Sequence, residues 1–324
     1  MNSVRLIALV VCLSVASAAN AVRHLGFTYA EQKQIFHDNA ARLLGLGHAQ
    51  TPHSIEAPVP DWLLGIWHRQ WIERAGVRSN PLDAEYLQTP SVFGDVRFLN
   101  DRPQFAHASS FADLTDADLR LLARQQGMTG RTSVVGAVAT WEHEVGFQPP
   151  DGTTDAGRLQ LANHGIMYEH GLDDSYTEAW QAAHAGGYLV IRIERSARLD
   201  RLLIVAGNRF LFVRNRAKDL PVSDSLEALI ASSRATRDQI IEYLDCEFST
   251  GTVPQGRAPW LIQRSTLPWR EGQRLELVDD ILAADVTNGM TRHNAGLEQW
   301  SIPVNTLGPN EIKTLFEDSP RAKR

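Results

Sequence analysis

The chain has 324 residues, of which 43% are hydrophobic and 22% charged, an ordinary composition for a globular protein. Its length allows two domains, or one β domain with appendages. The net charge of −6, with Arg and Lys scattered among carboxylates, argues against nucleic-acid binding. The two cysteines, Cys12 and Cys246, form no disulfide framework and have no metal-type spacing.

Residues 1–21 are typical of a secretory signal peptide. Arg5 precedes an apolar run over residues 6–15, and small residues follow at 16–19. The run is shorter than the roughly 20 residues that a transmembrane helix needs, so we expect no membrane span. This interpretation places the protein outside the cytoplasm, secreted or periplasmic. The alternative is an internal apolar helix left at the start of a shortened gene, which would leave the protein cytoplasmic.

Residues 22–50 form the next segment, which is predicted to be helical. Thr28 and Glu31 fit a capping box, an apolar stripe follows, and Gly45 and Gly47 end the helix. Residues 22–47 resemble the C-terminal helix of amidohydrolase-related (type 2) proteins through the string NAARLLGL at 39–46. That family's metal ligands lie in a barrel upstream, which is missing here. The resemblance therefore implies a remnant of an amidohydrolase fusion with no retained metal site, and a generic amphipathic helix is the alternative.

Residues 51–60 contain three prolines and no periodicity, which indicates a linker and a domain boundary. Residues 61–74, DWLLGIWHRQWIER, are predicted to form the first strand of a β-barrel. Trp67, Arg69 and Trp71 alternate on one face of this strand, and apolar residues occupy the other face.

Gly65-Ile66-Trp67 on this first strand resembles the Gly-x-Trp motif of the lipocalin (calycin) superfamily. Three longer strings, GIWHRQWI, LQTPSVFGDVRF and YTEAWQ, most resemble a branch of lipocalin-like proteins related to the fungal HRI-one type. The resemblance implies an antiparallel lipocalin-like barrel over residues 61–305, with a tryptophan across the base of the barrel.

The remaining elements are predicted from alternation, capping residues and turn residues. The strand candidates are 84–89, 91–99, 132–147, 164–170, 176–182, 187–195, 199–205, 208–216, 258–266, 273–282 and 298–304. The helix candidates are 114–127, 224–245 with a break near 232–233, and a short helix over 310–317 in the C-terminal segment 306–324. The short strand spacings favour an antiparallel meander over βαβ units. We therefore expect a mainly β protein, with one or two helices packed on a barrel.

Several polar side chains fall on faces predicted to point inward. The proposed ligand-binding residues are Arg69, Asp95, Arg97, Trp141, His143, Phe147 and Tyr168. Arg69, Asp95 and Arg97 are also predicted to form a charged network with Glu178. The alternative is that these are structural ion pairs and that His143 is a satisfied core residue, because a buried charge has to be paired.

The predicted function is the binding of a small hydrophobic or aromatic molecule inside the barrel, where tryptophans can stack on a flat ligand. The alternative is a lipocalin-fold enzyme of the isomerase, hydratase or decarboxylase type, with His143, Tyr168 and Glu178 as acid–base groups. No nucleophile-elbow, phosphate-loop, dinucleotide or zinc-protease motif is present. His164 and His170 would stand roughly 20 Å apart on one strand, so we expect no metal and no cofactor.

Overall fold

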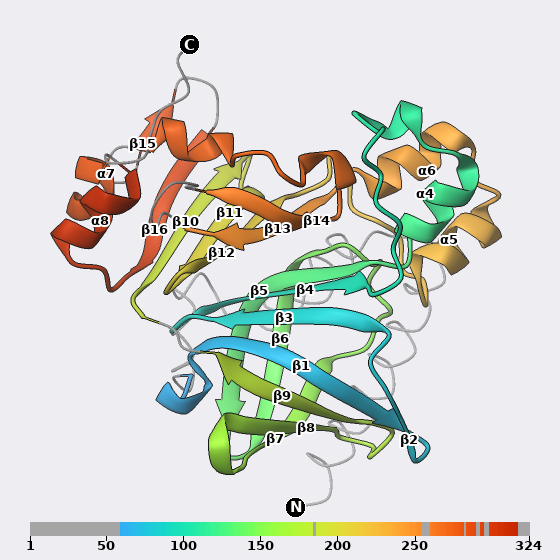
Figure 1. The fold of residues 1–324 in the computed structure, drawn as a ribbon, viewed down its shortest axis with the longest axis horizontal. Helices are drawn as coiled ribbons and strands as arrows, with labels where there is room; N and C mark the ends of the chain where they lie inside the picture. The colour runs from blue at the N-terminus through green and yellow to red at the C-terminus, as the bar shows by residue number, and fades with distance from the viewer. Residues whose placement is uncertain are drawn as a thin grey trace, which may run out of the picture.

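The computed structural model describes residues 59–183, 186–253, 260–281, 283–289, 292–294 and 298–316. The predicted signal peptide, the amidohydrolase-like helix and most of the linker lie outside these residues. The described chain forms two antiparallel sheets (Figure 1). The mainly β fold class is confirmed, and no helix in the described ranges is long and apolar enough to cross a membrane.

The first sheet is a closed barrel of eight antiparallel strands, consistent with a lipocalin-like barrel. Its strands in spatial order are β1 (Gly65–Arg74), β3 (Leu82–Gln88), β4 (Val92–Leu99), β5 (Gln126–Val135), β6 (Val138–Gly146), β7 (Asp155–Leu161), β8 (Ile166–Gly171) and β9 (Thr177–Ala183). Strand β9 pairs with β1 and closes the ring, while β2 (Val77–Ser79) is a short strand outside it that pairs with the end of β1.

The second sheet is open and has seven strands. Their spatial order is β14 (Leu261–Ser265), β13 (Glu247–Thr252), β12 (Arg209–Arg214), β11 (Arg198–Ala206), β10 (Tyr188–Arg195), β16 (Glu298–Asn305) and β15 (Arg292–Asn294). The strands that we expected in a single barrel are therefore divided between two sheets. The physical reason is that β3 and β9 take both edges of β1, so the barrel has no free edge left for β10.

Five α-helices are described, most of them short. They are α4 (Asp116–Leu122), α5 (Leu226–Ser233), α6 (Arg237–Leu244), α7 (Ala283–Asn288) and α8 (Pro309–Phe316). The capping box of Thr115 and Asp118 starts α4 as predicted, but the helix ends at Leu122 because Gln126 begins β5. The predicted break at 232–233 separates α5 from α6, where Arg234 is left-handed with φ 51°.

Two other predictions over the described residues are wrong. Residues 273–282, expected as a strand, contain the 3₁₀ helix η6 (Glu276–Asp280). The list of expected strands was also incomplete, because it lacked β7 and β13. Both strands contain a glycine, Gly157 in β7 and Gly251 in β13, and glycine is depleted in strands.

The two sheets pack in layers, with helices at the sides (Figure 1). One apolar core lies inside the barrel. A second lies between the barrel wall, one face of the open sheet and helices α4, α5 and α6, and a third lies under α7 and α8 on the opposite face. The barrel wall and the open sheet approach closely at Gly94, where a Cβ atom would overlap Leu211 Cδ2. A larger residue at 94 would push the layers apart.

Candidate functional site

The inward face of β1 changes at a bulge. Arg69 lies opposite Trp180 on β9, but Trp71 lies opposite Ala179, so one extra residue separates the two pairs. Trp67 and Arg69 are buried in the barrel, whereas Trp71 lies outside, with the guanidinium of Arg78 4.0 Å from its ring centroid. The prediction that Trp71 shares a face with Trp67 and Arg69 is therefore wrong.

The four charged side chains that were predicted to form a network do meet inside the barrel. Arg69 Nη1 donates to Glu178 Oε1 at 2.6 Å, and Arg97 Nη1 lies 3.4 Å from the same oxygen. Arg97 Nη2 also donates to Asp95 Oδ2 at 2.8 Å. Burial opposes the charged form of Arg97, but Asp95 and Glu178 hold its pKa well above the ordinary value. These contacts form two neighbouring ion pairs in a low-dielectric interior.

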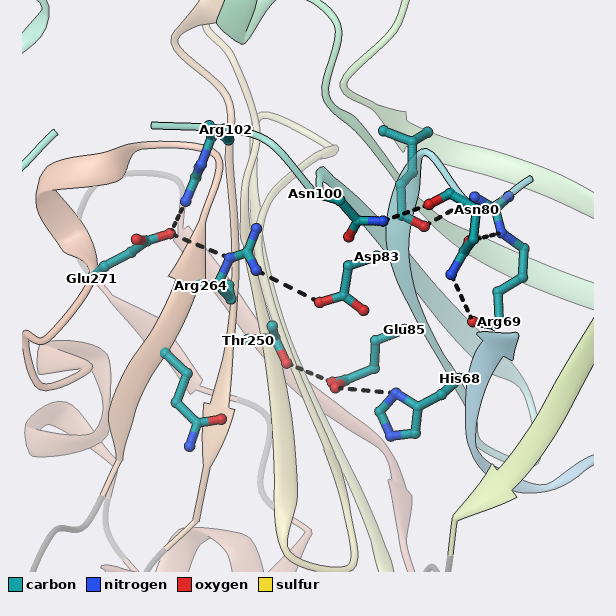
Figure 2. A network of polar contacts seen from close by, with 12 residues as sticks. His68, Arg69, Asn80, Asp83, Glu85, Asn100, Arg102, Thr250, Arg264 and Glu271 are labelled. Atoms are coloured by element: carbon teal, nitrogen blue, oxygen red, sulfur yellow. Dashed lines mark hydrogen bonds and ion pairs between the residues drawn. The ribbon is translucent and has the colours of Figure 1, made fainter. Parts of the chain in front are cut away.

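Further hydrogen bonds hold Arg69 in place. Its Nε donates to Asn80 Oδ1 at 3.3 Å, and its Nη2 donates to the backbone oxygen of Leu82 at 3.1 Å. Figure 2 shows Asn80 linking Arg69 to Asn100 at the edge of the barrel. Every nitrogen of Arg69 thus has a partner, which makes this residue a structural support for Glu178.

Strand β8 presents the face opposite to the one predicted. Met167 and Glu169 point into the barrel, opposite Trp180 and Glu178 on β9. Tyr168 lies outside, with its ring centroid 6.1 Å from that of Trp71. The placement of Tyr168 on an inward face is therefore wrong. A sequence signal for this arrangement was overlooked. Met167 and Glu169 are two apart on one strand and Glu178 and Trp180 are two apart on the next, so antiparallel pairing places the two carboxylates side by side.

Glu169 is the most perturbed acid in the barrel. Burial, and then the charge of Glu178, raise its pKa to about 8. Tyr176 Oη donates to Glu169 Oε1 at 2.8 Å. Because the pKa lies above neutrality, the carboxyl group holds a proton at pH 7 when the site is empty.

Four aromatic rings complete the interior wall. They belong to Tyr86, Phe93, Trp141 and Trp180. Trp141 Nε1 donates to Tyr86 Oη at 3.1 Å, and Tyr86 Oη in turn donates to Gln88 Oε1. Within the part of the chain that the structure describes, the buried indole nitrogen of Trp180 has no hydrogen-bond partner. The wall therefore combines flat apolar surface with one free donor.

These side chains surround a cavity at one end of the barrel. The lining residues are Tyr86, Phe93, Asp95, Arg97, Met128, Trp141, Asp155, Met167, Glu169 and Trp180. The cavity leaves about 30 Å³ in which the centre of a water molecule can move. Asp155 is 39% exposed and marks the opening, where its Oδ2 lies 2.7 Å from His143 Nε2.

The seven proposed ligand-binding residues thus occupy five different places, of which one, that of Tyr168, is outside the barrel. Asp95, Arg97 and Trp141 line the cavity, Arg69 and Glu178 lie beside it, and His143 stands at the opening. Phe147 packs in the core between the barrel and the open sheet, because a register shift opposite His143 and Val145 turns the end of β6 outward.

The three proposed acid–base residues do not form one group. Glu178 is buried against Arg69, His143 pairs with Asp155, and Tyr168 lies outside the barrel. Over the described ranges, no three His, Cys, Asp or Glu side chains are arranged to bind a metal ion.

Comparisons with known proteins give little further information. No protein-family model and no curated protein sequence matches the chain. Among solved structures, the chain is similar to an uncharacterized protein from Saccharomyces cerevisiae, with a TM-score of 0.44 and 12% identity over 75% of this chain and 99% of that one. The resemblances to the HRI-one branch and to the amidohydrolase helix stay predictions.

Proposed function

We propose that the barrel binds a small aromatic or hydrophobic molecule in its interior cavity, which is lined from strands β3 to β9. The observation that carries this proposal is the set of four aromatic side chains around a space whose lining includes the partly exposed Asp155, the partner of His143. Aromatic walls with a few polar groups are typical of small-molecule sites. Asp95, Arg97 and Glu169 supply those polar groups here.

The size of the cavity limits the ligand. In the same measure a water molecule needs about 10–15 Å³, so the space holds only a compact group. The ligand would therefore insert one end and leave the rest at the opening, beside Phe93 and His143, whose ring centroids lie 5.9 Å apart. Met128 and Met167 have flexible side chains, which give the wall room to adapt.

Intrinsic tryptophan fluorescence of the full chain tests this proposal. A panel of fatty acids, retinoids and phenolic compounds should include one class that quenches saturably, and Trp141→Phe should remove most of the change. Trp269→Phe is the matched control, because Trp269 packs on Phe111 outside the barrel. The proposal fails if no class quenches saturably, or if Trp141→Phe and Trp269→Phe behave alike.

The pair of His143 and Asp155 favours a second candidate, proton transfer to or from a ligand at the opening. A carboxylate that accepts from an imidazole orients it as a general base. His143→Ala should then abolish turnover of a bound compound while changing its affinity little. A binding protein would show no turnover in either form.

A further inference from the structure

We infer that the group entering the cavity is a compact cation, a primary ammonium held by Glu169 and the aromatic rings. This inference rests on the proposed function and specifies its ligand class. Inside the barrel, the two guanidinium groups of Arg69 and Arg97 face three buried carboxylates, those of Asp95, Glu169 and Glu178. Arg69 pairs with Glu178, and Arg97 pairs with Asp95.

Glu169 is the carboxylate in excess. Over the part of the chain that the structure describes, it makes no ion pair, and its hydrogen-bond donor is Tyr176 Oη. Yet Glu169 lines the cavity and is 8% exposed. A buried carboxylate without a counter-ion has to take up a proton or a cation. The raised pKa of about 8 shows that, without a ligand, the proton is favoured at neutral pH.

Glu178 adds a second acceptor on the same side of the barrel. It lies directly opposite Glu169 in the pairing of β8 with β9. Glu178 is 2% exposed, and none of the described residues forms a hydrogen bond to its Oε2. Side chains directly opposite on antiparallel strands lie about 5 Å apart, and like charges in that position repel. An ammonium group between the two carboxyl groups would offset this repulsion when Glu169 ionises, and it could donate to both.

The aromatic wall is suited to the same charge. Cations are attracted to the faces of Trp, Tyr and Phe rings within about 6 Å of the centroid. Arg97 Cζ already lies 5.6 Å from the Trp180 centroid, so this wall accommodates one cation. Tyr86, Phe93 and Trp141 supply further rings around the cavity.

An anionic ligand is the rival, because Arg97 also lines the cavity. However, Arg97 Nε and Nη2 donate to Asp95, and Nη1 lies against Glu178 Oε1. Each guanidinium nitrogen of Arg97 is therefore engaged within the barrel. An incoming anion would have to displace one of these contacts and would meet Glu169 and Asp155 as well.

Three probes with one ring and different charges test the inference on the full chain at pH 7. They are benzylammonium, benzyl alcohol and benzoate, titrated by tryptophan fluorescence and calorimetry. We expect benzylammonium to bind at least tenfold more tightly than the other two. Glu169→Gln should lower the affinity for benzylammonium at least tenfold and change the affinity for benzyl alcohol less than twofold. Glu227→Gln is the matched control, because Glu227 is exposed on α5.

The outcomes separate the two proposals. Equal binding of benzylammonium and benzyl alcohol would overturn the cation inference and leave the aromatic site standing. If benzoate binds most tightly, the cation inference is wrong and an anionic ligand bound by Arg97 is favoured. If no probe binds, both proposals are wrong.

A second measurement covers the case in which Glu169→Gln does not fold. Calorimetry in two buffers of different ionisation enthalpy should show that benzylammonium releases roughly one proton from the wild-type protein, because the bound cation ionises Glu169. Benzyl alcohol should release none. Absence of proton release with benzylammonium would contradict its placement at Glu169.

Discussion

The barrel interior and the layer between the barrel and the open sheet are both buried, but they differ in chemistry. The interior contains Arg69, Asp95, Glu169 and Glu178 and leaves a small cavity. The layer between the sheets is an apolar core in which β4 and β12 touch at Gly94. Apolar burial stabilises folding, whereas a buried charge pair is often replaceable without loss. The layer between the sheets therefore holds the fold together, whereas the interior keeps charged groups beside open space.

Polar contacts also join the barrel to the open sheet, some of them at the margin of that layer. Figure 2 shows Glu85 on the barrel reaching Thr250 and His68, and Arg264 lying between Asp83 and Glu271. Thr250 Oγ1 donates to Glu85 Oε1 at 2.6 Å, and Arg209 Nη2 lies 2.6 Å from Glu85 Oε2. These contacts link strands of the barrel to strands of the open sheet.

The largest effect should come from the layer between the sheets. Phe248 on β13 is fully buried against Gly127 on β5, where an added Cβ would lie 2.6 Å from its ring. Phe248→Ala should lower the free energy of unfolding by about 3–5 kcal/mol, because it leaves a cavity. Denaturant unfolding measures this change. Leu161→Ala, at a 47% exposed position, is the control, and a similar loss there would contradict the assignment.

A smaller loss is expected from the ion pairs inside the barrel. Arg69→Met leaves Glu178 buried with only the longer contact to Arg97, and should cost roughly 3 kcal/mol at neutral pH. Arg158→Met removes an exposed pair with Asp174 and should cost less than about 1 kcal/mol. Equal losses in the two variants would show that burial of the first pair has no energetic consequence.

Glu169→Gln should stabilise the protein, and by an amount that depends on pH. The folded pKa of Glu169 is raised from 4.5 to about 8, so the folded state holds a proton that the unfolded state has lost between these values. Wild-type stability therefore falls as pH rises through this window. We expect the variant to be more stable by roughly 4 kcal/mol at pH 8 and nearly equal at about pH 4. Thermal unfolding across this range would refute the ionisation of Glu169 if the difference stayed constant.

The smallest effect should lie at the margin shown in Figure 2. Arg264 Nη1 and Asp83 Oδ2 are 3.6 Å apart, and both side chains are partly exposed. A double-mutant cycle with Arg264→Ala and Asp83→Ala should give a coupling below about 1 kcal/mol, which high salt reduces. A larger coupling energy that salt does not reduce would show that this ion pair behaves like the buried ion pairs inside the barrel.

Local patterns in the sequence predicted the charged group well. Residues two apart on one strand share a face, which placed Asp95 with Arg97 and Trp67 with Arg69. The same rule failed beyond each β-bulge. It placed Trp71 inward and Phe147 in the cavity, since one extra residue in a strand reverses every later side chain.

The sequence by itself determined the mainly β composition, the capped start of α4 and the pairing of residues within a strand, because these depend on neighbours a few positions apart. Only the tertiary structure decided where the barrel closes and which face of β8 points inward. Those choices depend on partners such as β1 with β9, which are far apart along the chain. They brought Glu169 opposite Glu178, because register between strands is set by long-range packing that alternation within one strand does not encode.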